Sequence, residues 1–120
     1  MARILLADDD ATSRDLVSRG LAADGHKVVS TNDGGEALDK LGDTADGYDM
    51  LVTDVQMPVL DGISLAERAL SANPQLRILF MSGYASGIDR ARSLGGAHVS
   101  FLAKPFTLEQ IRAAVRSALA

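Results

Sequence analysis

The chain has 120 residues, the size of one ordinary domain, and 47% of them are hydrophobic and 23% charged. Its 12 lysines and arginines against 16 aspartates and glutamates give a formal charge of −4, which argues against nonspecific attraction to nucleic acid or anionic lipid. The chain has no cysteine, which excludes disulfides, zinc–thiolate sites and thiol catalysis. No apolar run is long enough to span a membrane and no secretion signal is present, so we expect one cytoplasmic domain over residues 1–120.

The first apolar run, residues 3–7, predicts a buried strand, and residues 11–23 have the spacing of a helix. Asp10 is placed to accept backbone hydrogen bonds as the N-cap of that helix, and Gly25 to end it. The expected inner face of the helix consists of Leu16, Val17 and Leu21.

A second strand is predicted over residues 27–31, followed by a short helix from about 35 to 41 with Asp33 as its cap. After a polar loop, residues 50–53 form a third apolar strand that ends at Asp54.

Asp61 can cap the next helix, and Asn73-Pro74 ends it before a fourth strand over residues 77–81. The expected inner face of the helix that Asp61 caps consists of Ile63, Ala66, Ala69 and Leu70. A weaker helix, interrupted by glycine, is predicted over roughly residues 86–94.

The fifth predicted strand covers residues 99–103. Thr107 and Gln110 then have the spacing of a capping box, which opens the last helix. Its apolar positions repeat at helical spacing through Ile111, Val115 and Leu119.

Strand and helix thus alternate five times, which is typical of a parallel sheet covered by helices on both faces. Right-handed crossovers narrow the topology to a doubly wound α/β domain, and we expect the flavodoxin-like (βα)5 strand order 2-1-3-4-5. In such folds ligands bind at the carboxyl ends of the strands.

Five polar side chains follow or end predicted strands at that one edge of the sheet: Asp8, Asp9, Asp54, Ser82 and Lys104. Carboxylates as close as those of Asp8, Asp9 and Asp54 repel one another, and a bound cation relieves the repulsion. Hard oxygen ligands in a partly hydrated pocket suit Mg²⁺, and the backbone carbonyl of Gln56 is expected to complete its shell.

A carboxylate beside Mg²⁺, a lysine and a hydroxyl can accept a phosphoryl group, because that transfer depends mainly on positioning and on charge stabilisation. Asp54 is the predicted nucleophile, and Lys104 and Ser82 are predicted to bind phosphoryl oxygens.

Four segments, ILLADDD, LVTDVQMPVLDG, ILFMSG and FLAKPF, occur in this order along the whole chain. Together they resemble the receiver domain of two-component response regulators. The resemblance implies a phosphorelay function, with Asp54 phosphorylated by a sensor histidine kinase or a histidine phosphotransfer protein, and with Asp8 and Asp9 as metal ligands. It also implies a cis peptide bond between Lys104 and Pro105.

The same resemblance implies a switch in which Ser82 moves toward the phosphoryl group and Phe101 changes rotamer. The output surface would be the face formed by the fourth helix, the fifth strand and the fifth helix. Such a domain is a phosphoacceptor and not an enzyme, apart from its own phosphorylation and dephosphorylation.

Two alternatives concern the class and the context of the protein. Asp8, Asp10 and Thr12 form a D-x-D-x-T motif similar to that of haloacid dehalogenase-like phosphohydrolases, which would make Asp8 the nucleophile; this leaves Asp54 unexplained. In context, the chain resembles single-domain regulators of the CpdR type, which help deliver substrates to a protease complex, and a receiver from a hybrid histidine kinase is the competing interpretation. We expect a downstream protein target, and neither nucleic acid nor a membrane as a partner.

Overall fold

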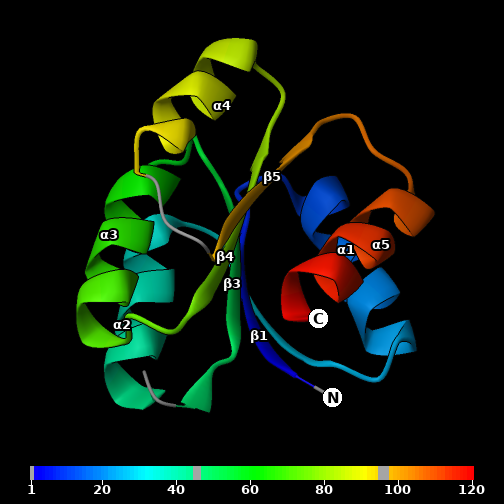
Figure 1. Ribbon diagram of the computed structural model, residues 1–120, viewed down its shortest axis with the longest axis horizontal. Helices are drawn as coiled ribbons and strands as arrows, with labels where there is room; N and C mark the ends of the chain where they lie inside the picture. Colours follow the sequence, from blue (N-terminus) through cyan, green and yellow to red (C-terminus); the bar gives the residue numbers. More distant parts are fainter. Residues whose placement is uncertain (1, 45–46, 95–97) are drawn as a thin grey trace.

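The computed structural model describes residues 2–44, 47–94 and 98–120, which build a sheet with helices packed on both of its faces (Figure 1). The strands are β1 (Arg3–Ala7), β2 (Lys27–Thr31), β3 (Met50–Asp54), β4 (Arg77–Ser82) and β5 (Val99–Ala103). The helices are α1 (Ala11–Ala23), α2 (Gly34–Thr44), α3 (Gly62–Ala72), α4 (Ala85–Arg92) and α5 (Leu108–Leu119). All strand pairs are parallel and the order is β2-β1-β3-β4-β5, which confirms the predicted doubly wound topology.

The helices begin where their sequences supply caps. The carboxylate of Asp10 accepts hydrogen bonds from the backbone N–H groups of Thr12 and Ser13 at the start of α1. At the start of α5, Thr107 and Gln110 form the predicted capping box. Gly25 has a φ of 87°, a left-handed conformation that ends α1 and that favours glycine.

Three predicted boundaries differ from the structure. The α2 helix covers Gly34–Thr44 instead of about 35 to 41, and the predicted cap Asp33 is confirmed, because its carboxylate accepts from the Glu36 N–H at 2.8 Å. The β4 strand extends to Ser82, whose carbonyl accepts a hydrogen bond from the Lys104 N–H at 2.8 Å and so continues the ladder.

The α4 helix covers Ala85–Arg92 instead of 86–94. It ends early because the Ser93 hydroxyl donates to the carbonyl of Arg90 at 2.6 Å, and this bond closes the last turn.

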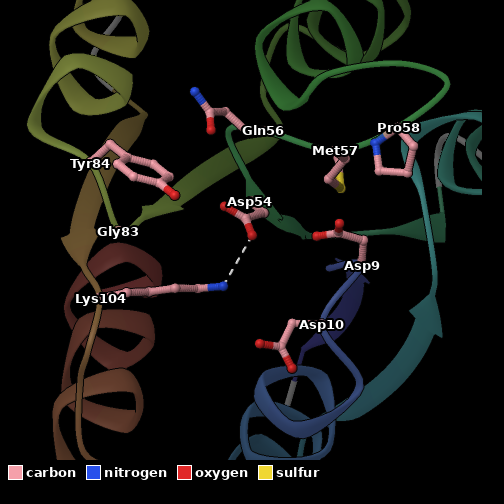
Figure 2. Close-up of a pocket in the computed structure, with 9 residues that line it drawn as sticks. All are labelled: Asp9, Asp10, Asp54, Gln56, Met57, Pro58, Gly83, Tyr84 and Lys104. Carbon is pink, nitrogen blue, oxygen red and sulfur yellow. Dashed lines mark hydrogen bonds and ion pairs between the residues drawn. The ribbon is translucent and has the colours of Figure 1, made fainter.

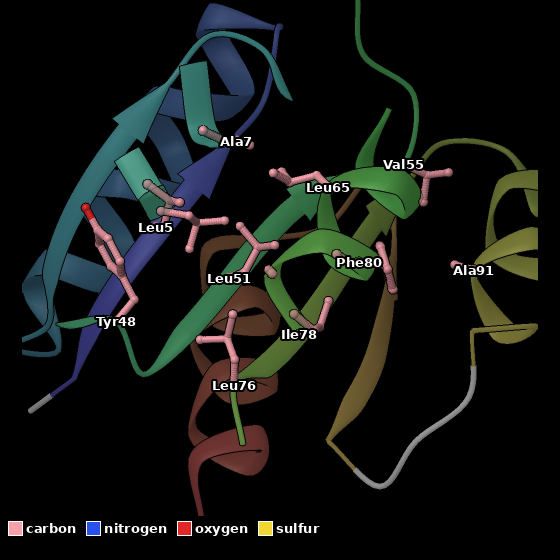
Figure 3. Packing of buried hydrophobic residues seen from close by; sticks show 14 residues of the cluster. Leu5, Ala7, Tyr48, Leu51, Val55, Leu65, Leu76, Ile78, Phe80 and Ala91 are labelled. Carbon is pink, nitrogen blue, oxygen red and sulfur yellow. The ribbon is translucent and has the colours of Figure 1, made fainter. Parts of the chain in front are cut away.

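The sheet separates two apolar layers because alternate strand side chains point to opposite faces. One layer packs under α2, α3 and α4 and includes Leu51 and Phe80 (Figure 3). The other packs under α1 and α5 and includes Val52 and Leu79. Burial on both sides explains why the strands are almost continuously apolar.

One expectation about the helix faces was wrong, and another was incomplete. Leu16 is 39% exposed, because it lies on the flank of α1 beside a groove that Pro105 and Phe106 also line. In α3, the predicted Ile63 is half-buried and packs against the core, and Leu65, which was not predicted, is fully buried there.

None of the helices in the described ranges combines the length and the apolar character that crossing a membrane requires.

Candidate functional site

A pocket of about 690 Å³ opens at the carboxyl ends of the strands, where the fold was expected to place a ligand (Figure 2). Its lining comes from the loops after β1, β3, β4 and β5, which are far apart in the sequence. The residues that line it are Asp9, Asp10, Asp54, Gln56, Met57, Pro58, Gly83, Tyr84 and Lys104.

Lys104 bridges two carboxylates at the base of this pocket. Its Nζ donates to Oδ2 of Asp54 at 3.0 Å and to Oδ2 of Asp8 at 3.1 Å. The Asp8 side chain is fully buried, and its other oxygen accepts a hydrogen bond from the Asp10 N–H at 2.9 Å. The Asp54 side chain is 14% exposed, so its carboxylate remains accessible from the pocket.

The site raises the pKa of both Asp54 and Lys104. Burial raises the pKa of Asp54 above its usual value, and the neighbouring charges of Asp8 and Asp9 act in the same direction, while the hydrogen bond from Lys104 only partly opposes them. For Lys104, burial opposes the charge, but the hydrogen bonds and charges of Asp54 and Asp8 raise its pKa overall. The lysine is therefore held as a cation beside the carboxylates.

Three carboxylates form a cluster that could hold a cation. One oxygen from each of Asp8, Asp9 and Asp54 lies within 4.8 Å of the others. Asp9 is exposed, and Gln56, two residues after Asp54, lines the same pocket. These are the hard oxygen donors that suit Mg²⁺, in a site open enough to leave room for water. The donor set therefore fits the predicted metal.

The Ser82 hydroxyl does not line the pocket. Ser82 is buried, and its Oγ donates to the carbonyl of Tyr84 at 3.0 Å and accepts from the Tyr84 N–H at 3.1 Å. Gly83 and Tyr84 line the pocket in its place.

Phe101 also lies away from the pocket. Its ring stacks on Phe80 with a centroid separation of 6.0 Å, and the guanidinium of Arg92 lies 5.2 Å from its centroid on the α4 side. Phe101 therefore connects β5 to the core and to α4.

Two residues beside Asp54 or its pocket were not singled out from the sequence. Tyr84 is 63% exposed, and its ring is directed toward Asp54 (Figure 2). At Gly62, a Cβ would lie 2.0 Å from the carbonyl oxygen of Asp54. Only glycine lets α3 begin against the Asp54 peptide. The motif Asp61-Gly62 carried that signal, whereas nothing local marked Tyr84.

The two predicted nucleophiles, Asp8 and Asp54, differ in accessibility. Both oxygens of Asp8 are occupied by hydrogen bonds and its side chain is inaccessible, whereas Asp54 is on the pocket wall.

The fold and this site together define the class of the protein. The family model of the response regulator receiver domain matches residues 4–116. The chain therefore belongs to the response regulator receiver domain family, a signalling domain of two-component systems, and the phosphohydrolase interpretation was wrong.

Among curated proteins, the chain is 38% identical over 117 residues to the response regulator MprA of Mycobacterium avium (strain 104), a match that covers 98% of this chain and 50% of that protein. The chain thus spans about half the length of the curated relatives it matches. Among solved structures, it resembles the receiver domain of the hybrid histidine kinase CckA, with a TM-score of 0.82 and 32% identity over 98% of this chain and 99% of that one. It also resembles the chemotaxis protein CheY4 of Vibrio cholerae, with a TM-score of 0.87 and 28% identity over 99% of each chain.

Proposed function

We propose that residues 1–120 form one receiver unit that accepts a phosphoryl group on Asp54 from a phosphohistidine. The donor is a sensor histidine kinase or a histidine phosphotransfer protein. The observation that carries this proposal is the placement of Asp54, whose accessible carboxylate lies 3.0 Å from the Lys104 ammonium and beside two further carboxylates in a receiver-family chain.

The transfer is an in-line displacement. One oxygen of the Asp54 carboxylate bonds to phosphorus while the bond from phosphorus to the imidazole nitrogen breaks, and the electron pair of that bond stays on the imidazole. Lys104 is close enough to neutralise charge on a phosphoryl oxygen. Its ammonium would then replace its present hydrogen bond to Asp54 with one to that oxygen.

Asp8, Asp9 and Asp54 would hold Mg²⁺ with the backbone carbonyl of Gln56. When bound, the ion neutralises negative charge on the phosphoryl oxygens, which otherwise repels the carboxylates. Beyond its own phosphorylation and dephosphorylation, the domain is proposed to turn over no substrate.

Phosphorylation would be transmitted by Ser82 and Phe101 to the face formed by α4, β5 and α5, which contacts a downstream protein in the cytoplasm. The contact of Phe101 with both Phe80 and Arg92 supports this route, because it joins β5 to α4. Two contexts remain predictions: a CpdR-type regulator that acts with a protease complex, and a part of a hybrid histidine kinase. The absence of nucleic-acid contacts also remains a prediction, because half of the length of the curated relatives lies outside the match.

The test is the intact mass of the protein after incubation with acetyl phosphate, with Mg²⁺ and with a chelator. We expect a gain of one phosphoryl group that requires Mg²⁺ and is absent from Asp54→Asn. Asp15→Asn, which changes an exposed carboxylate on α1, is the matched control and should be labelled like the wild type. Labelling of Asp54→Asn would contradict the proposal.

A further inference from the structure

The Ser82 hydroxyl has one proton, and in this structure that proton is already in use. Oγ donates it to the carbonyl of Tyr84 at 3.0 Å, while a lone pair accepts from the Tyr84 N–H at 3.1 Å. Ser82 therefore cannot donate to a phosphoryl oxygen on Asp54 without giving up its bond to the Tyr84 carbonyl.

Tyr84 is the residue at which α4 begins. It is the N-cap of the helix but provides no side-chain cap, and its carbonyl also accepts from the N–H groups of Gly87 at 3.1 Å and Ile88 at 3.3 Å. The Ser82 hydroxyl thus anchors the backbone of the residue from which the first turn of α4 is built.

Gly87 provides the space that the hydroxyl occupies. A Cβ at Gly87 would lie 2.5 Å from the Oγ of Ser82, well inside van der Waals contact, and 3.4 Å from its Cβ. The Ser82 backbone is held separately, because its carbonyl accepts from the Lys104 N–H at 2.8 Å. Because Oγ is the free end of the Ser82 side chain, rotation to another rotamer relieves the contact without moving the backbone.

We infer that Gly87 is a positioning residue, which keeps the Ser82 hydroxyl bound to Tyr84 and so holds α4 in its present arrangement until a phosphoryl group competes for that hydroxyl. The inference rests on the proposed function only for the identity of the competitor. A phosphoryl group on Asp54 would bind the Ser82 hydroxyl only in the rotamer that has left Tyr84, and it would therefore shift the population toward that rotamer.

The direct test is the crystal structure of unphosphorylated Gly87→Ala, with Gly42→Ala as the matched control. Gly42 also lies in a helix, but a Cβ there meets nothing within 4 Å. We expect Ser82 to leave the rotamer that binds Tyr84 in Gly87→Ala and to keep it in Gly42→Ala. Hydrogen exchange should become faster at the first amides of α4 in Gly87→Ala and stay unchanged there in Gly42→Ala. The higher helix propensity of alanine would by itself make this exchange slower, so faster exchange points to the lost Ser82 bond. Retention of both bonds between Ser82 and Tyr84 in Gly87→Ala would overturn the inference.

The functional test is the Mg²⁺-dependent affinity for beryllofluoride, a phosphoryl mimic. A net intramolecular hydrogen bond changes an equilibrium constant by roughly a factor of five. In Gly87→Ala the bond from Ser82 to Tyr84 is already broken, so this variant should bind beryllofluoride about fivefold more tightly than the wild type. Gly42→Ala should bind like the wild type, and the gain should vanish when Gly87→Ala is combined with Ser82→Ala and compared with Ser82→Ala alone.

The two proposals fail in different ways. Wild-type binding without a gain in Gly87→Ala would overturn the role of Gly87 and leave the phosphoacceptor intact. Absence of binding in every variant would count against the proposed function, while the rotamer of Ser82 in the crystal structure would still decide the role of Gly87.

Discussion

Lys104 and Asp54 are 50 positions apart in the sequence, yet the lysine Nζ lies 3.0 Å from the Oδ2 of Asp54. The same ammonium lies 3.1 Å from the buried Oδ2 of Asp8, so a single cation partly neutralises two carboxylates. The site therefore remains short of positive charge, which is the condition that favours a bound divalent cation.

Replacing Lys104 with Met should lower the free energy of unfolding by about 3 kcal/mol in the presence of a chelator, because the fully buried carboxylate of Asp8 would lose its cationic partner. Mg²⁺ at millimolar concentration should recover part of the loss. Urea unfolding with and without Mg²⁺ measures both effects. Lys27→Met, at an exposed position on β2, is the control and should change stability little. Equal stability of Lys104→Met and the wild type in chelator would contradict this account.

Asp54→Asn should raise the free energy of unfolding at neutral pH, by up to about 1 kcal/mol. Burial raises the folded-state pKa of Asp54 above its unfolded value, so its ionised form opposes folding. As the pH falls through the raised pKa, the wild type binds a proton in the folded state and the advantage of the variant should disappear. Thermal unfolding at a series of pH values tests this, and a wild type more stable than Asp54→Asn at pH 7 would be the opposite result.

The contact between α1 and α5 should depend on an ion pair at the far end of α1. Arg112 donates from Nε to Oδ1 of Asp24 at 2.9 Å, and this hydrogen bond lowers the pKa of Asp24. The pair should therefore stabilise the fold at neutral pH and lose its effect as the pH falls through the lowered pKa.

A double-mutant cycle with Asp24→Asn and Arg112→Gln measures this coupling. We expect a clear interaction in the midpoint of thermal unfolding. The same cycle at Asp15 and Arg19, whose paired side chains are 58% and 77% exposed, should give almost none. Equal couplings for the two pairs would show that the burial of Asp24 has no effect.

Val59 has a φ of 72° and is 82% exposed in the loop after β3. A β-branched residue in this left-handed region is strained, and its exposure means that little packing compensates. Val59→Asn should therefore raise the free energy of unfolding by about 1 kcal/mol, measured by urea titration. Val59→Ala keeps the Cβ and should gain less. A destabilised Val59→Asn would mean that contacts of the valine outweigh the strain.

The sequence predicted most accurately the features that act over a few residues. Asp10 and Thr107 each cap a helix by hydrogen bonds within three positions, so their roles can be read locally. Predictions were less accurate where a distant contact decides the outcome, as at the end of β4, where the Ser82 carbonyl accepts a hydrogen bond from the Lys104 N–H at 2.8 Å.

By itself the sequence determined the strand order, the edge of the sheet that carries the site and the gathering of Asp9, Asp54 and Lys104, because alternating strands and helices allow few topologies. Only the tertiary structure decided which carboxylate is accessible and where the Ser82 hydroxyl points. Both depend on how closely elements approach one another. The Asp8 side chain is buried against Lys104, and the absence of a side chain at Gly87 leaves space for the Ser82 hydroxyl. Such distances of a few ångströms arise from packing between segments far apart in the chain, which local patterns do not record.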